Sequence, residues 1–124
     1  MIVALYARVS SDRQKEKQTI GSQIAALQEH AQKAGYDVPA EWIFQDEGYS
    51  GAILVRPALE QLRDLVAEGA LDAVIVHSPD RLSRKYAYQV LLLEEFARQG
   101  TQIVFLRAPA GETPEEQLLV QFQG

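Results

Sequence analysis

Cysteine is absent from the 124 residues of this chain. Its absence excludes disulfide bonds, thiolate catalysis and metal sites built from cysteine. Long apolar runs are absent too: none approaches the roughly 20 residues that a membrane-spanning helix requires, so we expect no membrane contact. The first residues, Met1–Leu5, lack the basic leader and the longer apolar stretch of a secretory signal. Together these absences predict a cytoplasmic protein.

Basic residues are in the minority, since 12 Lys and Arg stand against 17 Asp and Glu, a formal net charge of −5. Bulk positive charge is therefore not the means by which this domain would hold nucleic acid. Phosphate-binding loops of the G-x-G-x-x-G and G-x-x-x-x-G-K-[ST] types are missing as well. The two histidines, His30 and His77, do not have metal-ligand spacing, so we expect no metal site.

Short apolar segments alternate along the chain with segments of helical periodicity. Strands are expected at 2–7, 42–44, 73–76 and 103–106. Helices are expected at 20–34, from Pro57 to a stop at Gly69, and at about 84–99. Near the end, residues 113–116 are typical of a capping box that begins another helix, which the chain cuts off at Gly124.

This alternation predicts an α/β fold with a mainly parallel central sheet of four or more strands and helices on both faces, a flavodoxin-like layering. Right-handed crossovers place the carboxyl ends of the strands at one edge, where open α/β sheets bind ligands. Polar residues follow each expected strand, in chain order Arg8 and Ser10; Asp46, Tyr49, Ser50 and Arg56; Ser78, Asp80, Arg81 and Arg84; and Arg107. A candidate site is therefore expected at this edge.

Arginine is the unusual component of this edge. Eight of the 12 basic residues are arginine. Besides Arg107, four of them are expected at the edge, namely Arg8, Arg56, Arg81 and Arg84. A guanidinium stays charged and matches a phosphate in two-point contact, and several arginines around one hydroxyl are typical of phosphoryl transfer. Without cysteine, a serine hydroxyl is the plausible nucleophile; Ser10 is close to Arg8, and Ser11 is an equal candidate on chemistry alone.

Structural interpretations stand beside these functional ones. If residues 80–84 are helical, Asp80, Arg81 and Arg84 share one arc, and Asp80 can hold a guanidinium or handle a proton. The same spacing is equally compatible with an ordinary surface pair of Asp80 and Arg84. Arg56 before Pro57 is compatible with a merely solvated side chain. Asp46 is compatible with a turn residue.

Four motifs in order resemble the catalytic domain of serine site-specific recombinases, the resolvase/invertase family. They are Tyr6–Ser10, Asp46–Gly51, Arg56–Pro57 and Asp80–Arg84, and the resemblance covers nearly the whole chain. It implies a resolvase-like catalytic domain over residues 1–113. It also implies that residues 114–124 begin a long helix leading to a DNA-binding region that is missing from the chain.

The resemblance implies a chemistry and a set of roles. Ser10 matches the nucleophile that attacks a DNA phosphodiester and leaves a 5′-phosphoserine link with a free 3′-hydroxyl. Arg8, Arg81 and Arg84 match the arginines that bind the scissile phosphate. Asp80 matches the acidic residue beside them, and Arg56 matches a further active-site arginine. Supporting polar positions are matched by Gln14, Gln23, Asp46 and Ser50.

The family exchanges one ester for another on double-stranded DNA, and it needs no metal or cofactor. It implies a homodimer on DNA, a synaptic tetramer, and a bacterial, phage or mobile-element origin. The loop before Arg56 and the segment Leu91–Phe96 look more like the large transposon and phage recombinases, whereas Pro79 replaces the aliphatic residue of many members. The isolated chain is expected to be inactive or nearly so.

Two other functions compete with recombination. One is a non-enzymatic flavodoxin-like regulatory or nucleotide-binding module, whose usual glycine-rich signals are missing. The other is a catalytically silent assembly domain, against which the presence of every motif arginine argues. The proton acceptor for Ser10 stays open at this level.

Overall fold

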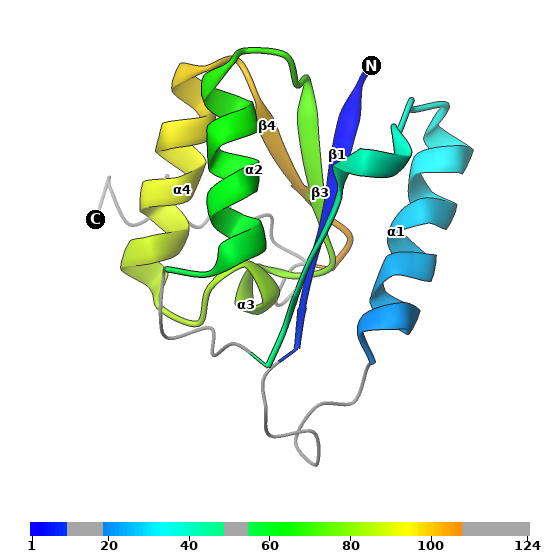
Figure 1. Cartoon of the computed structure of the whole chain (residues 1–124), viewed down its shortest axis with the longest axis horizontal. Helices are drawn as coiled ribbons and strands as arrows, with labels where there is room; N and C mark the ends of the chain where they lie inside the picture. The colour runs from blue at the N-terminus through cyan, green and yellow to red at the C-terminus, as the bar shows by residue number, and fades with distance from the viewer. Residues whose placement is uncertain (10–18, 49–54, 108–124) are drawn as a thin grey trace.

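A four-stranded parallel sheet forms the centre of the computed structural model, which describes residues 1–9, 19–48 and 55–107 (Figure 1). Its strands are β1 (Val3–Val9), β2 (Ile43–Glu47), β3 (Ala73–Val76) and β4 (Gln102–Phe105), in the spatial order β2-β1-β3-β4. The helices are α1 (Ile20–Ala34), α2 (Pro57–Ala67), α3 (Pro79–Leu82) and α4 (Tyr86–Arg98), with a 3₁₀ turn, η1, at Ala40–Trp42. The expected parallel α/β fold is confirmed.

Helices cover both faces of the sheet, with α1 on one face and α2 and α4 on the other (Figure 1). The central strand β1 supplies both cores because successive side chains of a strand point to opposite faces. Leu5 packs in the core that contains Leu27 of α1. Tyr6 packs in the other core, together with Leu62 of α2 and Phe96 of α4. None of the described helices is long and apolar enough to cross a membrane.

Local signals explain why α1 and α2 begin and end where they do. The side chain of Thr19 accepts a hydrogen bond from the Ser22 N–H at 3.1 Å and so caps the first turn of α1. Gly35 ends α1 in the left-handed conformation, with φ of 74°, which glycine adopts without a steric penalty. Pro57 occupies the first position of α2, where a missing N–H costs nothing. The predicted starts and stops of these two helices are close to those observed.

Two of the strands, β1 and β2, extend further than their apolar patterns, whereas β3 has the expected range and β4 is shifted by one residue from the expected 103–106. β1 continues to Val9 and β2 to Glu47, so Arg8 and Asp46 lie inside strands and are register partners, not residues that follow them. The backbone ladder continues through these polar positions because main-chain pairing does not depend on side-chain polarity. Trp42, predicted to lie in the second strand, belongs instead to the 3₁₀ turn η1, in which the Trp42 N–H donates a hydrogen bond of 2.9 Å to the Pro39 carbonyl.

The expected helix over 84–99 is shorter than predicted and is preceded by a separate helix. α3 ends where the Ser83 N–H bonds to the Pro79 carbonyl at 3.0 Å, and Ser83 itself is extended, with φ of −161° and ψ of 145°. α4 begins only at Tyr86. Residues 80–84 are therefore not one helix, and the condition for a shared helical arc of Asp80 and Arg84 is not met. The capping box at 113–116 lies outside the described residues.

One ion pair joins the two helices of the same face. Arg63 of α2 donates from Nε and Nη2 to the two carboxylate oxygens of Glu95 on α4, at 2.8 and 2.6 Å. Such a two-point pair fixes both side chains, so we expect a coupling of about 0.5–1 kcal/mol in a double-mutant cycle of Arg63→Ala and Glu95→Ala. The exposed pair of Lys33 and Glu29 within α1 serves as the control, with an expected coupling of about 0.3–0.5 kcal/mol. Urea unfolding measures both; equal couplings would contradict the expectation.

Candidate active site

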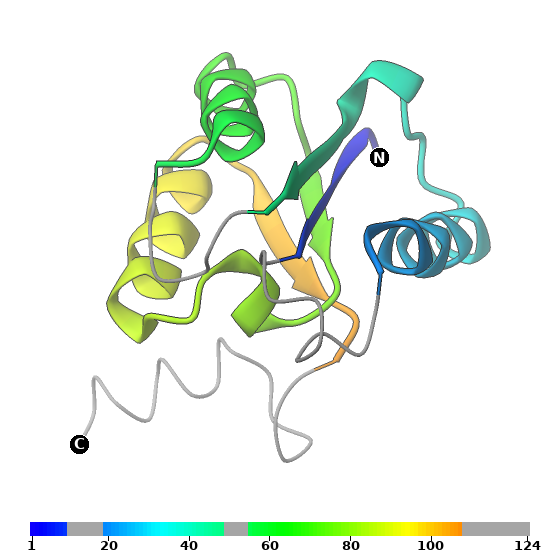
Figure 2. The ribbon, with the colours of Figure 1, turned by 60° about the horizontal axis from the view of Figure 1, so that its bottom comes forward.

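The carboxyl ends of the strands gather the polar residues singled out in the sequence. Figure 2 turns these ends toward the viewer, and α3 lies beside the ends of β1 and β3. Three described segments meet there: the end of β1 with Arg8, the start of α2 with Arg56, and α3 with Asp80 and Arg81. Ser10, Gln14 and Ser50 lie outside the described residues. The expected edge is the one at which the described candidate residues collect.

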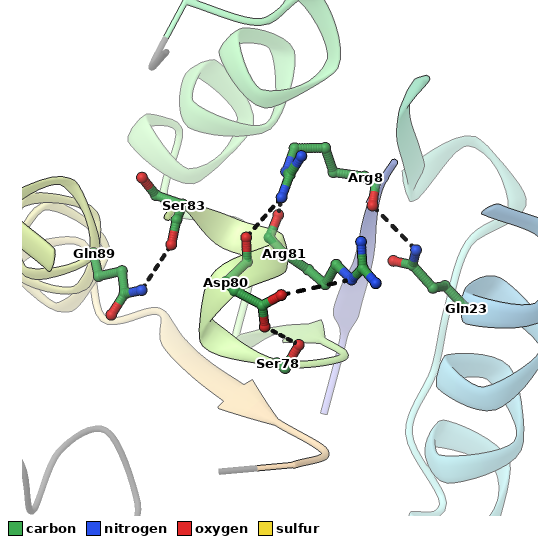
Figure 3. A network of polar contacts seen from close by, with 7 residues as sticks. All are labelled: Arg8, Gln23, Ser78, Asp80, Arg81, Ser83 and Gln89. Carbon is green, nitrogen blue, oxygen red and sulfur yellow. Dashed lines mark hydrogen bonds and ion pairs between the residues drawn. The ribbon is translucent and has the colours of Figure 1, made fainter. Parts of the chain in front are cut away.

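Arg8 of β1 is wholly buried and forms hydrogen bonds with both α3 and α1. Its guanidinium donates from Nε to the Arg81 carbonyl at 3.1 Å and from Nη2 to the Asp80 carbonyl at 2.7 Å (Figure 3). Its own main-chain carbonyl accepts a hydrogen bond of 3.1 Å from Nε2 of Gln23, a buried residue of α1. Arg8 therefore fixes the end of β1 relative to both α1 and α3.

Asp80 and Arg81 form the charged pair on α3. The Asp80 carboxylate, 59% exposed, accepts a hydrogen bond of 2.6 Å from the Ser78 hydroxyl, and its Oδ2 lies 3.9 Å from Nε of Arg81 (Figure 3). The Arg81 side chain is nearly buried, at 11% exposed. The structure thus places the guanidinium of Arg81 beside Asp80, whereas the surface-pair interpretation had paired Asp80 with Arg84. A largely covered guanidinium with one carboxylate beside it is an oriented cation at the sheet edge.

Arg84 is exposed on the short connection between α3 and α4. The residues around it are fixed by hydrogen bonds: the Ser83 hydroxyl accepts from the Lys85 N–H at 3.2 Å, and the Ser83 carbonyl accepts from Nε2 of Gln89 at 2.7 Å. Ser83 itself is wholly buried. The connection therefore presents Arg84 to solvent from a well-anchored backbone.

Arg56 is wholly buried, so the interpretation that it is merely solvated is wrong. It is the last residue before α2, its Nη2 donates to the Leu82 carbonyl at the end of α3, and its guanidinium carbon lies 5.7 Å from the centre of the Tyr6 ring. Burial lowers the pKa of Arg56 from its ordinary value, while Tyr6 and Asp46 oppose that shift. Nε and Nη1 of Arg56 have no hydrogen-bond partner among the described residues.

Asp46 anchors the start of α2. Its Oδ1 accepts a hydrogen bond from the Ala58 N–H at 2.9 Å, and its Oδ2 accepts from the Leu59 N–H at 3.0 Å and from the Tyr6 hydroxyl at 2.7 Å. A carboxylate at this end of a helix satisfies free N–H groups and interacts favourably with the helix dipole. The interpretation of Asp46 as a turn residue is therefore wrong. Burial is the main cause that raises the pKa of Tyr6, so its hydroxyl stays protonated and donates.

Sequence reasoning missed Tyr6 as a member of this group and gave His77 no role. For Tyr6 a signal existed, because a tyrosine in a central, fully buried strand must find an internal partner for its hydroxyl. For His77 the signal was weaker: it directly follows β3, is 9% exposed, and its carbonyl accepts a hydrogen bond from the Arg107 N–H at 2.9 Å. Among the described residues, no cluster of three or more His, Asp or Glu side chains is arranged to hold a metal ion.

His77 predicts an acid-sensitive stability. Burial, with the charges of Arg107 and Arg81, lowers the pKa of His77 below its ordinary value despite the opposing charge of Asp80. The unfolded chain therefore takes up a proton more readily, and this contribution to stability is lost as the pH falls below the unfolded pKa of about 6.5. We expect urea unfolding between pH 7.5 and 5 to show a steeper loss of stability for the unmodified protein than for His77→Gln. Equal slopes would contradict this assignment.

Comparison with known proteins places this geometry in a family. The fold and site define an α/β domain whose sheet edge carries oriented arginines around the end of β1. A family model described as "Resolvase, N terminal domain" matches residues 3–124, and the chain belongs to this family of serine recombinase catalytic domains. The resemblance found in the motifs is thereby confirmed.

Named relatives agree with that assignment. A "Putative DNA recombinase" of Bacillus subtilis is 36% identical over 124 residues, which are 99% of this chain and 24% of that protein. The Transposon Tn501 resolvase of Pseudomonas aeruginosa is 34% identical over 103 residues, 82% of this chain and 45% of that protein. The chain thus spans less than half the length of each of these relatives.

Solved structures with the same fold include two catalytic domains. The N-terminal catalytic domain of TP901-1 integrase is 33% identical, with a TM-score of 0.77 over 86% of this chain and 77% of that chain. The C-terminal catalytic domain of ISC1926 TnpA, an IS607-like serine recombinase, is 29% identical, with a TM-score of 0.76 over 98% of this chain and 79% of that chain. Both therefore support the fold and the family.

Proposed function

We propose that this domain cleaves and rejoins DNA strands in site-specific recombination through a covalent 5′-phosphoserine at Ser10. The observation that carries the proposal is the placement of two arginines at the end of β1, the strand that leads directly to Ser10. Arg8 lies within the strand, and the backbone of Arg81 is bonded to its guanidinium. Membership in the resolvase family supports the same chemistry.

In the proposed reaction the Ser10 hydroxyl oxygen attacks the phosphorus of a DNA phosphodiester. The bond from phosphorus to the 3′ oxygen breaks, the phosphate stays on the 5′ end as an ester of Ser10, and the serine proton ends on the 3′ oxygen. Re-ligation reverses these steps with a different 3′-hydroxyl. Since each step replaces one phosphate ester by another, no external source of energy is required.

The charged residues have separate roles in this proposal. Arg8, Arg81 and Arg84 bind the scissile phosphate, where negative charge on the equatorial oxygens must be stabilised. Asp80 orients Arg81, in keeping with their 3.9 Å separation, and is itself oriented by the Ser78 hydroxyl. Gln23 positions Arg8 through the carbonyl of that residue. Gln14 and Ser50 keep the supporting roles that the family resemblance implies.

The proposal extends to assembly. Residues 1–113 form the catalytic domain, residues 114–124 begin the helix that leads to a DNA-binding region, and the whole protein acts on double-stranded DNA as a homodimer and then a synaptic tetramer. The net charge of −5 fits this division, because a few aimed arginines suffice for one phosphate whereas affinity for a site needs many phosphate contacts. The isolated chain is accordingly expected to be inactive or nearly so.

Covalent capture tests the proposed function. The intact protein is incubated with sheared genomic DNA of its host, the reaction is stopped with detergent, and protein-linked DNA is recovered and sequenced to identify the site. Nicked duplexes built from that sequence then compare Ser10→Ala with the matched variant Ser11→Ala. We expect adducts to disappear with Ser10→Ala and to persist with Ser11→Ala. Adducts that persist with Ser10→Ala would remove Ser10 from the mechanism.

A further inference from the structure

The short helix α3 is held at its carboxyl end by two buried arginines. The carbonyls of three successive residues, Asp80, Arg81 and Leu82, all accept hydrogen bonds from guanidinium groups. Arg8 donates to the first two from β1, and Arg56 donates to the third from the start of α2. The last carbonyls of a helix lack partners within it and carry partial negative charge, so cations are favourable there. A helix of four residues has little stability of its own, and these contacts supply it.

We propose that Arg56 is a positioning residue of the recombination site: it fixes α3 and through it Arg81, and it does not bind the scissile phosphate. Arg8 and Arg56 are both wholly buried, and their positions separate them: Arg8 lies in β1, two residues before Ser10 in the chain, whereas Arg56 precedes α2 and donates to the end of α3. Its Nη2 is committed to the Leu82 carbonyl, the residue next to Arg81 in the chain. This inference rests on the proposed function, because it assigns a role within that site.

Tyr6 and Asp46 help to hold Arg56 in place. Asp46 accepts the Ala58 and Leu59 N–H groups and so fixes the first turn of α2, which starts directly after Arg56. The Tyr6 hydroxyl holds the Asp46 carboxylate, and the Tyr6 ring lies beneath the Arg56 guanidinium at 5.7 Å. A buried cation without a carboxylate bonded to it gains from an aromatic face. Tyr6 thus positions Arg56 in two ways. Its ring contacts the guanidinium directly, and its hydroxyl holds Asp46, which fixes the start of α2 next to Arg56.

Hydrogen exchange in the intact protein without DNA tests the positioning role. Arg56→Met keeps a similar volume in the buried position but removes every donor, so the core can persist while the Leu82 carbonyl loses its partner. We expect exchange at the Arg81 and Ser83 amides to accelerate by about tenfold relative to β3 amides. Arg63→Met, which removes an arginine from α2 that bonds to α4, is the matched control and leaves these two amides unchanged. Unchanged exchange in Arg56→Met would overturn the inference.

A double-mutant cycle tests whether Arg56 acts through α3. On the nicked duplex recovered by covalent capture, we expect Arg56→Met to slow adduct formation by about 10²-fold, the cost of a catalytic group misplaced by about an ångström. In an Arg81→Ala background the same change should cost less than about threefold, because groups that act through one another are not additive. Tyr6→Phe should show a smaller loss with the same dependence on Arg81. Losses that multiply would instead indicate an independent phosphate contact for Arg56.

The proposed function and the positioning role of Arg56 can be refuted independently of each other. If the unmodified protein forms no adduct, the proposed function is wrong, whereas the exchange result still decides whether Arg56 holds α3. If adducts form and depend on Ser10 but exchange at α3 is insensitive to Arg56, the function stands and the positioning role is wrong.

Discussion

Arg81→Ala is expected to lower the rate of adduct formation by about 10²–10³-fold, the usual cost of removing one donor that stabilises developing charge in a transition state. The side chain is nearly buried and its Nε lies 3.9 Å from the Asp80 carboxylate, so it enters the reaction already oriented. Its backbone is held by Arg8 through the Arg81 carbonyl. A preorganised cation needs no rearrangement as charge develops, which is why its loss should fall mainly on the chemical step.

Single-turnover cleavage of the nicked duplex, with DNA binding measured separately, checks this prediction. Arg98→Ala is the matched control, because Arg98 lies at the end of α4, is exposed, and pairs with Glu94 of its own helix at 3.9 Å. We expect this control to cleave at the unmodified rate. A weaker binding constant with an unchanged cleavage rate in Arg81→Ala would mean that Arg81 binds DNA without acting in the reaction.

Asp46→Ala is expected to reduce the free energy of unfolding by about 2–4 kcal/mol, since it removes a helix cap and leaves buried donors without acceptors. The donors that lose their acceptor are the Ala58 and Leu59 N–H groups and the Tyr6 hydroxyl. All of this lies in the interior, because Asp46 is only 2% exposed and Tyr6 is wholly buried. Water is therefore poorly placed to replace the lost bonds.

Urea unfolding of three variants separates this effect from a general loss of charge. Asp46→Asn keeps the shape and one acceptor oxygen, so it should lose about half as much stability as Asp46→Ala. Asp64→Ala removes an exposed carboxylate from the middle of α2 and should change stability by less than about 0.5 kcal/mol. Equal losses for Asp46→Ala and Asp64→Ala would show that the carboxylate of Asp46 does not anchor the helix.

The fold was predictable where local patterns and global packing agree. The apolar steps from Ile20 onward and the stop at Gly35 predict α1, and the uninterrupted apolar run at 73–76 predicts a strand buried on both faces. The patterns failed where tertiary contacts decide. A four-residue spacing from Asp80 to Arg84 is compatible with a helix, but the backbone ends that helix at Leu82 and extends at Ser83.

The site was predictable in its residues and not in their surroundings. The motifs identify Arg8, Arg56 and Arg81, yet arginine is usually a surface residue, so their burial was not expected. Arg8 and Arg56 can be buried because backbone carbonyls of α3 accept their hydrogen bonds. Every residue has a carbonyl, so the sequence does not reveal which carbonyls a buried arginine will meet. The role of Asp46 was hidden for a related reason, because the N–H groups that it accepts come from residues 12 and 13 positions further along the chain.

The location of the covalent bond tests the central claim most directly. Protein-linked DNA from the capture reaction is digested with nuclease and protease, and the peptide that carries the nucleotide is sequenced by tandem mass spectrometry. The account predicts a 5′-phosphate ester on Ser10, within the peptide that continues β1, together with a free 3′-hydroxyl on the other DNA end. A nucleotide attached to Ser11 or to any other residue, or a phosphate left on the 3′ end, would contradict it.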